Sequence, residues 1–339
     1  MTPARADTMR SKRTLGATGL TTSPLGLGLA ALGRPGYINV GHGRDLGPDR
    51  DRATMERGAH AVLDAAYDAG IRYFDAARSY GLAEAFLASW LVKRGVSPGS
   101  VVVGSKWGYT YTAGWRVDAE THEVKDHSLD VFRRQLSESR DLLGAHLAVY
   151  QIHSATIDSG VLDDDAVVDA LAAARATGLH VGLSVSGPRQ AETIWRALEV
   201  RRDGVRVFET VQATWNLMER GAEEALVAAS DAGVGVIVKE ALANGRLARP
   251  QSAGDDHRFA VLHDLATELG VGADSLALAC ALSRPWASVA LSGATTTSQL
   301  ASNVRATEID VSDEAFQRLS ALRVDSERYW RERSELVWN

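Results

Sequence analysis

The chain has 339 residues and a formal net charge of −6, with 45 % hydrophobic and 24 % charged residues, which is typical of a globular protein with a large core. The acidic balance argues against nucleic acid as the main partner. No apolar stretch approaches the ~20 residues of a membrane span, so a membrane is not expected either. The only cysteine, Cys280, excludes an intrachain disulfide and fits a reducing compartment, so a cytoplasmic location is expected.

Two parts are expected along the chain. Residues 1–10 contain no hydrophobic segment and are predicted to be a flexible tail, and residues 11–339 are predicted to form one domain. Within this domain, short β-branched runs alternate with longer segments whose apolar residues recur every three or four positions. The short runs predict strands at residues 23–29, 71–74, 100–105, 147–153, 179–185, 207–214, 234–240 and 287–294.

The segments between these runs predict helices. The first carries Ala59, Val62 and Leu63 on one face and follows a glycine-rich loop at residues 33–47. Further helices are predicted at residues 83–91, 128–144, 163–178, 188–199, 222–233, 273–283 and 297–307, with extra C-terminal helices at about 257–269 and at 313–322. Eight strands, each followed by a helix, predict an α/β fold of the single (β/α)8 TIM-barrel type. A doubly wound open sheet is the alternative, but no Gly-x-Gly-x-x-Gly follows the first strand.

Polar side chains stand where three successive predicted strands end. The second strand is followed by Asp75, with Tyr80 in the next loop. The third strand is followed by Lys106, and the fourth ends at His153. Because the active site of such a barrel lies at the carboxyl ends of its strands, these four side chains are expected to meet at one rim.

The four residue types together suit proton transfer to a carbonyl group. A phenol has a pKa of about 10, and a nearby ammonium lowers it, so Lys106 can make Tyr80 a better general acid. Asp75 can pair with Lys106 and hold it in place. His153 can donate a hydrogen bond that orients the substrate carbonyl. No side chain supplies hydride, so a nicotinamide or flavin cofactor is implied.

These residues carry a resemblance to a known family. The segments "RTLGATGLTTSPLGLG", "FDAARSYGLAEAFLASWL", "YQIH" and "SGATTTSQLASNVRA" make the chain similar to the aldo-keto reductases over nearly its whole length. The resemblance implies a (β/α)8 barrel closed at the bottom by an N-terminal hairpin, and a nicotinamide cofactor held without a Rossmann fold. It places the family's catalytic tetrad on Asp75, Tyr80, Lys106 and His153.

The resemblance also implies a set of cofactor contacts. At two positions the chain departs from the family: Val185 stands in place of an amide side chain, and Lys239 stands where an aromatic ring stacks on the nicotinamide, with Trp215 as the candidate to replace that ring. The cofactor-binding residues implied are Gly28, Leu29, Asp75, Ser184, Gln212, Lys239, Glu240, Ala241, Leu242, Asn244, Gly245, Arg246, Gly293, Ala294, Thr295, Gln299 and Asn303.

The cofactor form is less sharply predicted. The family favours NADP(H), but Gly293 and Gln299 occupy the places of the basic residues that often grip the 2′-phosphate. NADP(H) is therefore expected with weak discrimination, and NAD(H) is possible. A strong preference for NADP(H) would point to Arg246 or Arg305 as the residue that reaches the phosphate.

The substrate pocket is expected to use the long loop after Lys106. This loop is rich in aromatic residues, of which Trp107 and Trp115 are predicted to contact substrate. Two histidines in it, His122 and His127, lack a metal-ligand spacing, so no metal is expected.

Three functions remain open from the sequence. The first is reduction of an aldehyde or ketone, or the reverse reaction. The second is oxidation of an aldose to its lactone, which the weak 2′-phosphate site suggests. The third is a regulatory subunit that senses the cofactor with little turnover, which the altered nicotinamide platform suggests. The partner is expected to be a small carbonyl compound or sugar, and the oligomeric state stays open.

Overall fold

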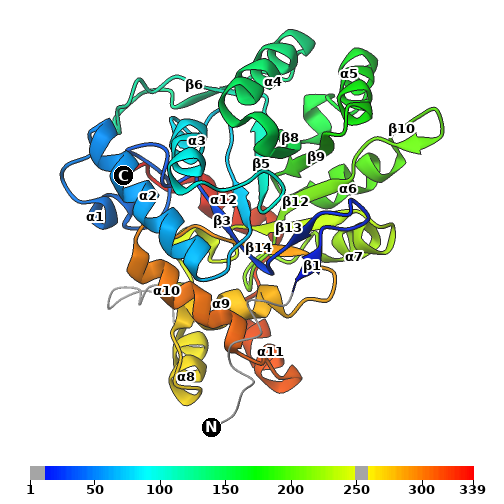
Figure 1. Ribbon diagram of the computed structural model, residues 1–339. Coiled ribbons are helices and arrows are strands. Elements are labelled where there is room, and N and C mark those ends of the chain that lie inside the picture. The colour runs from blue at the N-terminus through cyan, green and yellow to red at the C-terminus, as the bar shows by residue number, and fades with distance from the viewer. Residues whose placement is uncertain (1–11, 249–258) are drawn as a thin grey trace.

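The computed structural model describes residues 12–248 and 259–339, and the expected tail at residues 1–10 lies outside them. Eight parallel strands close into a barrel in the order β12, β13, β14, β3, β4, β5, β8, β9, which confirms the predicted (β/α)8 fold over an open sheet (Figure 1). The strands are β3 (Leu25–Gly28), β4 (Tyr73–Asp75), β5 (Val102–Trp107), β8 (Leu147–Ala155), β9 (His180–Val185), β12 (Thr210–Thr214), β13 (Gly235–Lys239) and β14 (Val289–Ser292).

Helices surround the barrel because each buries one apolar face against it. In α2, Asp51 caps the N-terminus by accepting from the amides of Ala53 and Thr54, and the predicted face with Val62 and Leu63 is buried. The helices that follow the strands are α2 (Arg52–Asp68), α3 (Ala83–Arg94), α4 (Leu129–Leu143), α5 (Asp165–Ala176), α6 (Gln190–Glu199), α7 (Glu223–Asp231), α9 (Ala273–Leu282) and α10 (Thr297–Arg305).

A small hairpin lies at the amino-terminal end of the barrel, as expected. Strands β1 (Arg13–Thr14) and β2 (Thr21–Thr22) pair antiparallel, and Leu15 between them is fully buried against barrel residues. Gly16 has a positive φ of 56° and touches the backbone before β13, where a side chain would collide. This contact closes the end of the barrel opposite the predicted site.

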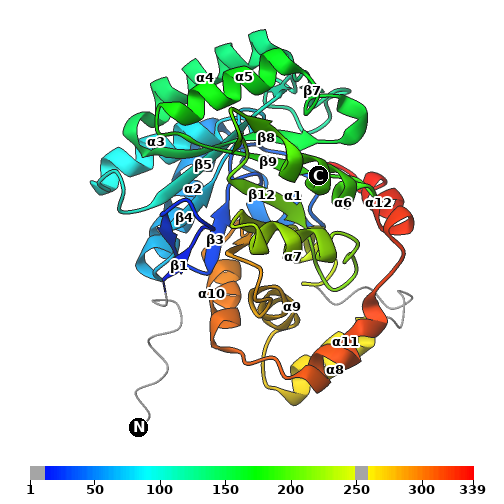
Figure 2. The same cartoon turned by 90° about the vertical axis from the view of Figure 1, so that its right-hand side faces the viewer.

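Two further helices form a second core outside the barrel. Helix α8 (Ala260–Glu268) and helix α11 (Asp313–Leu319) lie side by side in Figures 1 and 2, and both pack with α9 in one apolar cluster. Residues 257 and 258, where the first of these helices was expected to begin, lie outside the described residues. The cluster also buries Cys280, whose pKa is raised to about 12 by that burial.

Several elements are not among those predicted. They are the short helix α1 (His42–Leu46) in the glycine-rich loop, the hairpin β6 (Tyr109–Tyr111) with β7 (Glu123–Lys125), the hairpin β10 (Arg201–Arg202) with β11 (Val205–Arg206), and helix α12 (Ser326–Ser334) in the tail. After α11, the chain returns to the barrel through α12 (Figure 2).

Among residues 12–248 and 259–339, no single helix combines the length and apolar character of a membrane span. Helices α8 and α9 meet that test only as a pair, and they are bent by 91° relative to each other.

Candidate active site

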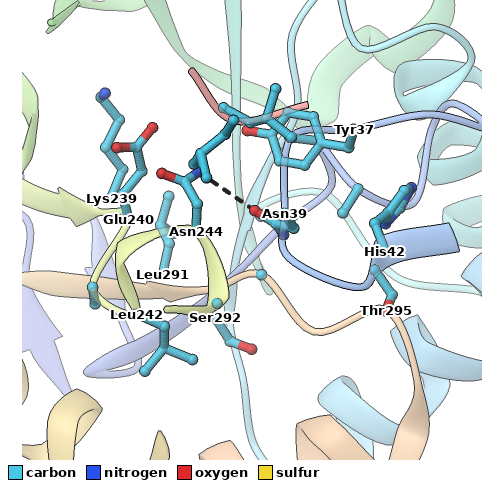
Figure 3. A pocket seen from close by; sticks show the side chains of 18 of the residues that line it. Tyr37, Asn39, His42, Lys239, Glu240, Leu242, Asn244, Leu291, Ser292 and Thr295 are labelled. Atoms are coloured by element: carbon cyan, nitrogen blue, oxygen red, sulfur yellow. Dashed lines mark hydrogen bonds between the residues drawn. The ribbon is translucent and has the colours of Figure 1, made fainter. Parts of the chain in front are cut away.

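A cavity of about 680 Å³ opens where the barrel strands end. Its lining comes from the ends of several strands, from the loop after β3 and from the C-terminal tail. Figure 3 shows Lys239 and Glu240 at one side of this pocket and His42 and Thr295 at the other. The cavity therefore has two ends, here called the Tyr80 end, which includes Lys239, and the Gln299 end, which includes Thr295.

A buried ion pair lies beneath the Tyr80 end. The Lys106 ammonium pairs with the Asp75 carboxylate and also donates to the Ala76 carbonyl at 2.9 Å. Gln212 Nε2 donates to the other Asp75 oxygen at 2.9 Å. All three side chains are almost wholly buried, and Lys106 itself does not line the cavity. Because both charges are out of water, each depends on the other, and their geometry is fixed.

Tyr80 and His153 reach the cavity side by side. Tyr80 Oη lies 3.5 Å from His153 Nε2, and Ser79 Oγ lies 3.3 Å from His153 Nδ1. The pairing of β8 with β9 shifts register between Ile152 and Ala155, and Ser154 has a positive φ of 51°. Such a bulge redirects a side chain at a strand end. The four residues of the expected tetrad are thus brought together.

The charges around the Tyr80 phenol differ from the expectation. Burial, followed by the nearby Asp75 carboxylate, raises the pKa of Tyr80 well above its usual range, and Arg34 acts in the opposite direction. Lys106 Nζ lies 4.9 Å from the phenol ring centre but is paired with Asp75. Arg34 also lies over the Tyr80 ring, at 5.2 Å, and is itself paired with Glu123. Two cations therefore flank the phenol, where the sequence indicated one.

The His153 ring is held in its neutral form. Burial, and then the charges of Lys106, Lys239 and Arg34, lower its pKa well below the usual value. A neutral imidazole has one N–H, and the tautomer with that proton on Nε2, toward Tyr80, is compatible with a Ser79 hydroxyl that donates to Nδ1.

A second charged group extends from β13 to the tail. Lys239 Nζ donates to Thr214 Oγ1 at 3.0 Å, and Thr214 donates to Glu240 at 3.2 Å. Arg333 of α12 binds the Glu240 carboxylate through Nε at 3.0 and 2.9 Å. Burial alone would raise the pKa of Glu240, but Arg333 and Lys239 bring it down to about 2. Burial lowers the pKa of Lys239 to about 8, although Glu240 opposes this.

At the Gln299 end, carboxylates line the cavity. Gln299 Nε2 donates to Asp45 of α1 at 2.8 Å, while Gln299 Oε1 accepts from the Thr295 amide at 2.9 Å. Asn303 Nδ2 donates to Asp274 at 3.0 Å. The lysine and arginine side chains among the described lining residues are those of Arg34, Lys239 and Arg333, and all three lie at the Tyr80 end.

Most of the residues expected to bind cofactor line this cavity, and a few do not. Leu29 and Ser184 are buried away from it, and Ser184 Oγ accepts from the Ser154 amide at 2.8 Å, which supports the bulge beside His153. Arg246 is directed to the tail, 3.6 Å from Glu332. Those that line the cavity are Gly28, Asp75, Gln212, Lys239, Glu240, Ala241, Leu242, Asn244, Gly245, Gly293, Ala294, Thr295, Gln299 and Asn303.

The tryptophans expected at the substrate pocket lie elsewhere. Trp107 is fully buried against Phe132, and Trp115 packs on Phe86 with its indole N–H bound to a backbone carbonyl. Trp215 is also buried outside the cavity. Strand geometry explains Trp107, because adjacent residues point to opposite faces and Lys106 points into the barrel.

Arg34, Tyr37 and Trp338, which the sequence did not indicate, line the cavity instead of these tryptophans. Arg34 lies between the rings of Tyr37 and Trp338, at 4.7 and 4.8 Å, and Trp338 stacks on His122 at 3.8 Å. Asn339 ties the tail to the loop after β3, because its Nδ2 donates to the Asn39 carbonyl at 2.9 Å. The buried arginine among aromatic residues had no periodic signal in the sequence.

The cavity suits a long polar cofactor. Gly28 and Gly293 line it without side chains, and a Cβ at Gly293 would have only Asn39, at 3.9 Å, within 4 Å. Asn244 Oδ1 is buried and has no hydrogen-bond partner, although Asn244 Nδ2 donates to Asn39 at 3.4 Å (Figure 3). An unsatisfied buried acceptor at the cavity is consistent with a ligand that donates to it. Among the described residues, no group of three or more His, Cys, Asp or Glu side chains could hold a metal ion.

Comparison with known proteins agrees with this arrangement. A sequence model of the aldo/keto reductase family matches residues 24–324. The chain belongs to the aldo-keto reductase family. This family assignment makes it an NAD(P)-dependent oxidoreductase.

Similar proteins cover nearly its full length. The oxidoreductase YrpG of Bacillus subtilis (strain 168) is 29 % identical over an alignment of 329 positions, and the match covers 90 % of this aldo-keto reductase and 94 % of YrpG. Pyridoxal 4-dehydrogenase of Microbacterium luteolum is 27 % identical over an alignment of 350 positions, gaps included, which covers 91 % of this chain and 96 % of that protein. The structure of PA4992 from Pseudomonas aeruginosa matches with a TM-score of 0.63 and 27 % identity, covering 88 % and 95 %. The holo form of AKR11C1 from Bacillus halodurans shares the fold, with a TM-score of 0.71, 22 % identity and coverage of 94 % and 99 %.

Proposed function

We propose that this aldo-keto reductase interconverts a small carbonyl compound and its alcohol, with Tyr80 as the proton donor or acceptor. The observation that carries the proposal is the contact of Tyr80 Oη with a neutral His153 at 3.5 Å, while Lys106 Nζ of the buried Lys106–Asp75 pair lies 4.9 Å from the Tyr80 ring centre. A substrate oxygen placed between Tyr80 and His153 would receive two hydrogen bonds.

Each residue then has a defined task. Tyr80 gives its phenolic proton to the carbonyl oxygen during reduction and removes it from the hydroxyl during oxidation. His153 donates from Nε2 to the same oxygen and so orients the carbonyl. Lys106 and Arg34 stabilise the phenolate that remains, and Asp75 holds Lys106 in position. When bound, the nicotinamide supplies or accepts the hydride.

The cofactor would lie along the cavity from the Tyr80 end to the Gln299 end. Gln212 and Asn244 are placed to bind it through side-chain amides. Asp45 and Asp274 would lie near the adenosine ribose, where a carboxylate can accept from the 2′-hydroxyl of NAD(H) and repels the 2′-phosphate of NADP(H). The sequence favoured NADP(H) with weak discrimination; with these carboxylates in view, we expect NAD(H) to bind at least as well.

Oxidation of a sugar or similar cyclic hemiacetal to a lactone is the second candidate. The carboxylates at the Gln299 end support it, because they favour NAD(H). Polar groups also line the Tyr80 end, including Glu123, Ser154 and Ser186, and can bind hydroxyl groups. The similarity to a protein named pyridoxal 4-dehydrogenase is in line with an oxidative role.

An initial-rate screen tests both candidates. Purified protein is assayed with aldehydes, ketones and aldoses, each with all four nicotinamide forms. Turnover of aldehydes or ketones with a reduced cofactor supports the first candidate, and aldose oxidation with NAD⁺ supports the second. No turnover with any pair would contradict both and would favour a regulatory subunit.

A further inference from the structure

The positive and negative charges of the side chains at the Tyr80 end do not sum to zero. Lys106 is neutralised by Asp75, and Arg34 is neutralised by Glu123. His153 is neutral. The remaining group contains two cations and one carboxylate: Glu240 is bound directly by Arg333 and through Thr214 by Lys239. These seven charged side chains together therefore carry one net positive charge.

This charge is close to where hydride must move. A hydride donor has to lie roughly 3 to 3.5 Å from the carbon that it attacks, and the oxygen on that carbon contacts Tyr80 and His153. The nicotinamide ring therefore has to lie at the Tyr80 end. Lys239 lines the same cavity, and its charge acts on His153. The ring and Lys239 would therefore share this end of the cavity.

The two redox states of the ring respond differently to such a charge. The oxidised nicotinamide ring is a cation, and the reduced ring is neutral. We propose that Lys239 makes the site bind the reduced cofactor more tightly than the oxidised cofactor, so that the bound oxidised form is a stronger hydride acceptor than in water. This inference rests on the proposed oxidoreductase function.

The consequence for the reaction concerns its direction in the bound state. In oxidation, a bound oxidised nicotinamide would accept the hydride as the carbinol C–H bond breaks, and the hydroxyl proton would pass to the Tyr80 phenolate and from there to solvent. Products are the carbonyl compound, the reduced cofactor and one proton. Lys239 favours this direction at the site because the transfer removes the positive charge beside it; the overall equilibrium in solution is unchanged.

Simple electrostatics gives the size of the effect. Two unit charges about 6 Å apart, at an effective dielectric constant of roughly 20 to 40, change relative affinities by about tenfold to a hundredfold. Glu240 weakens the field of Lys239, and Arg333 restores part of it. The ratio of the two cofactor affinities is therefore expected to change by at least about tenfold.

Isothermal titration calorimetry tests the proposal without turnover. The dissociation constants of the oxidised and reduced cofactor are measured for the wild type, Lys239→Met and Lys239→Arg. The ratio of the two constants should favour the reduced form in the wild type, should fall about tenfold or more in Lys239→Met, and should be kept in Lys239→Arg. Lys93→Met, which removes an exposed lysine from the outer helix α3, is the matched control and should keep the wild-type ratio.

The outcomes distinguish a failure of the Lys239 inference from a failure of the proposed oxidoreductase function. An equal ratio in the wild type and Lys239→Met would overturn the inference and leave the proposed function intact. If none of the four nicotinamide forms binds the wild type, the proposed function is wrong and the inference is wrong with it. If Lys239→Met does not fold, Lys239→Gln keeps a hydrogen bond to Thr214 possible and gives the same comparison.

Discussion

Two parts of the cavity hold their charges in different ways. At the ends of β4 and β5, Asp75 and Lys106 are held by the backbone pairing of adjacent barrel strands. Near the tail, Glu240 is held by Arg333, a residue 93 positions away that contacts it only through side chains. The first part is fixed once the barrel closes, and the second depends on the docking of α12. We therefore expect proton transfer to depend on the Asp75–Lys106 pair, here called the rigid part. We expect the electrostatic effect on the cofactor to depend on the Glu240–Arg333 pair, which can be changed without altering the barrel strands.

The largest expected effect removes the acid from the rigid part. In Tyr80→Phe, only the phenolic hydroxyl is lost, so turnover should fall roughly 10²- to 10⁴-fold while cofactor affinity stays near that of the wild type. Steady-state rates and calorimetric cofactor titrations check this. Tyr67→Phe, in α2 outside the cavity, is the control. Turnover near wild type would show that Tyr80 is not the proton donor.

Changing Lys106 asks whether the rigid part acts as one unit. Lys106→Met leaves the buried Asp75 carboxylate without its cation, so the phenol pKa should rise and residual activity should shift to higher pH. We expect kcat at neutral pH to fall roughly tenfold to a thousandfold, which corresponds to the free energy of one buried ion pair. The pH profile of kcat is the measurement. An unchanged profile together with an unchanged rate would mean that Lys106 has no role in proton transfer.

Removing Arg333 breaks the Glu240–Arg333 pair that joins α12 to the barrel. Arg333→Met leaves Glu240 buried without its main cation, and the free energy of unfolding should fall by about 2 to 4 kcal/mol. The same variant should lessen the preference for reduced cofactor. Urea unfolding and calorimetry give both values, and Arg331→Met, an exposed position on the same helix, is the control. Wild-type stability in Arg333→Met would show that α12 docks without this pair.

The pH dependence of cofactor binding sharpens the comparison further. Lys239 faces Glu240, Arg333, Lys106 and Asp75, and its pKa is about 8. Well below pH 8 it is charged, so the preference for reduced cofactor should be complete there and should decline by about tenfold as pH rises through 8 to 9.5. Lys239→Met should show no such decline. A flat wild-type profile from pH 7 to 9.5 would exclude Lys239 as the titrating group.

The smallest expected effect concerns the Gln299 end. Asp45→Asn removes one carboxylate near the expected ribose site, so the ratio of NADP(H) to NAD(H) affinity should rise by roughly threefold to tenfold, as for a partly exposed charge. Asp49→Asn, which changes an exposed aspartate shortly after α1, should leave the ratio unchanged. A constant ratio in Asp45→Asn would place the adenosine ribose away from this carboxylate.

The sequence predicted the rigid part better than the tail, for a physical reason. Polar residues that end apolar runs mark strand ends, and parallel strand ends meet at one rim. Helix α12 has no comparable signal: it buries only Tyr329 and Trp330, and its other positions are largely polar. Its place depends on contacts such as that of Tyr329 with Asn216, 113 positions away. Contacts between such distant segments cannot be derived from local periodicity.

Trp107 shows a different limit. The third predicted strand, residues 100–105, continues in the structure to Trp107, so the residue follows the alternation of a strand and not that of a loop. Since Lys106 points into the barrel, Trp107 must point outward to α4. Because the predicted strand ended at residue 105, two residues too early, Trp107 was placed in a loop that could reach a substrate.

The position of Trp338 has a spectroscopic consequence. Of the eight tryptophans, all within the described residues, only Trp338 lines the cavity, and it stacks on His122 at 3.8 Å. With the oxidised cofactor, which does not absorb where tryptophan emits, the emission of the other seven should change little, whereas the emission of Trp338 should respond to a nearby nicotinamide. The difference between wild type and Trp338→Phe would then isolate the signal of one indole. Rapid-mixing fluorescence could follow cofactor entry and release at that position, with no added dye.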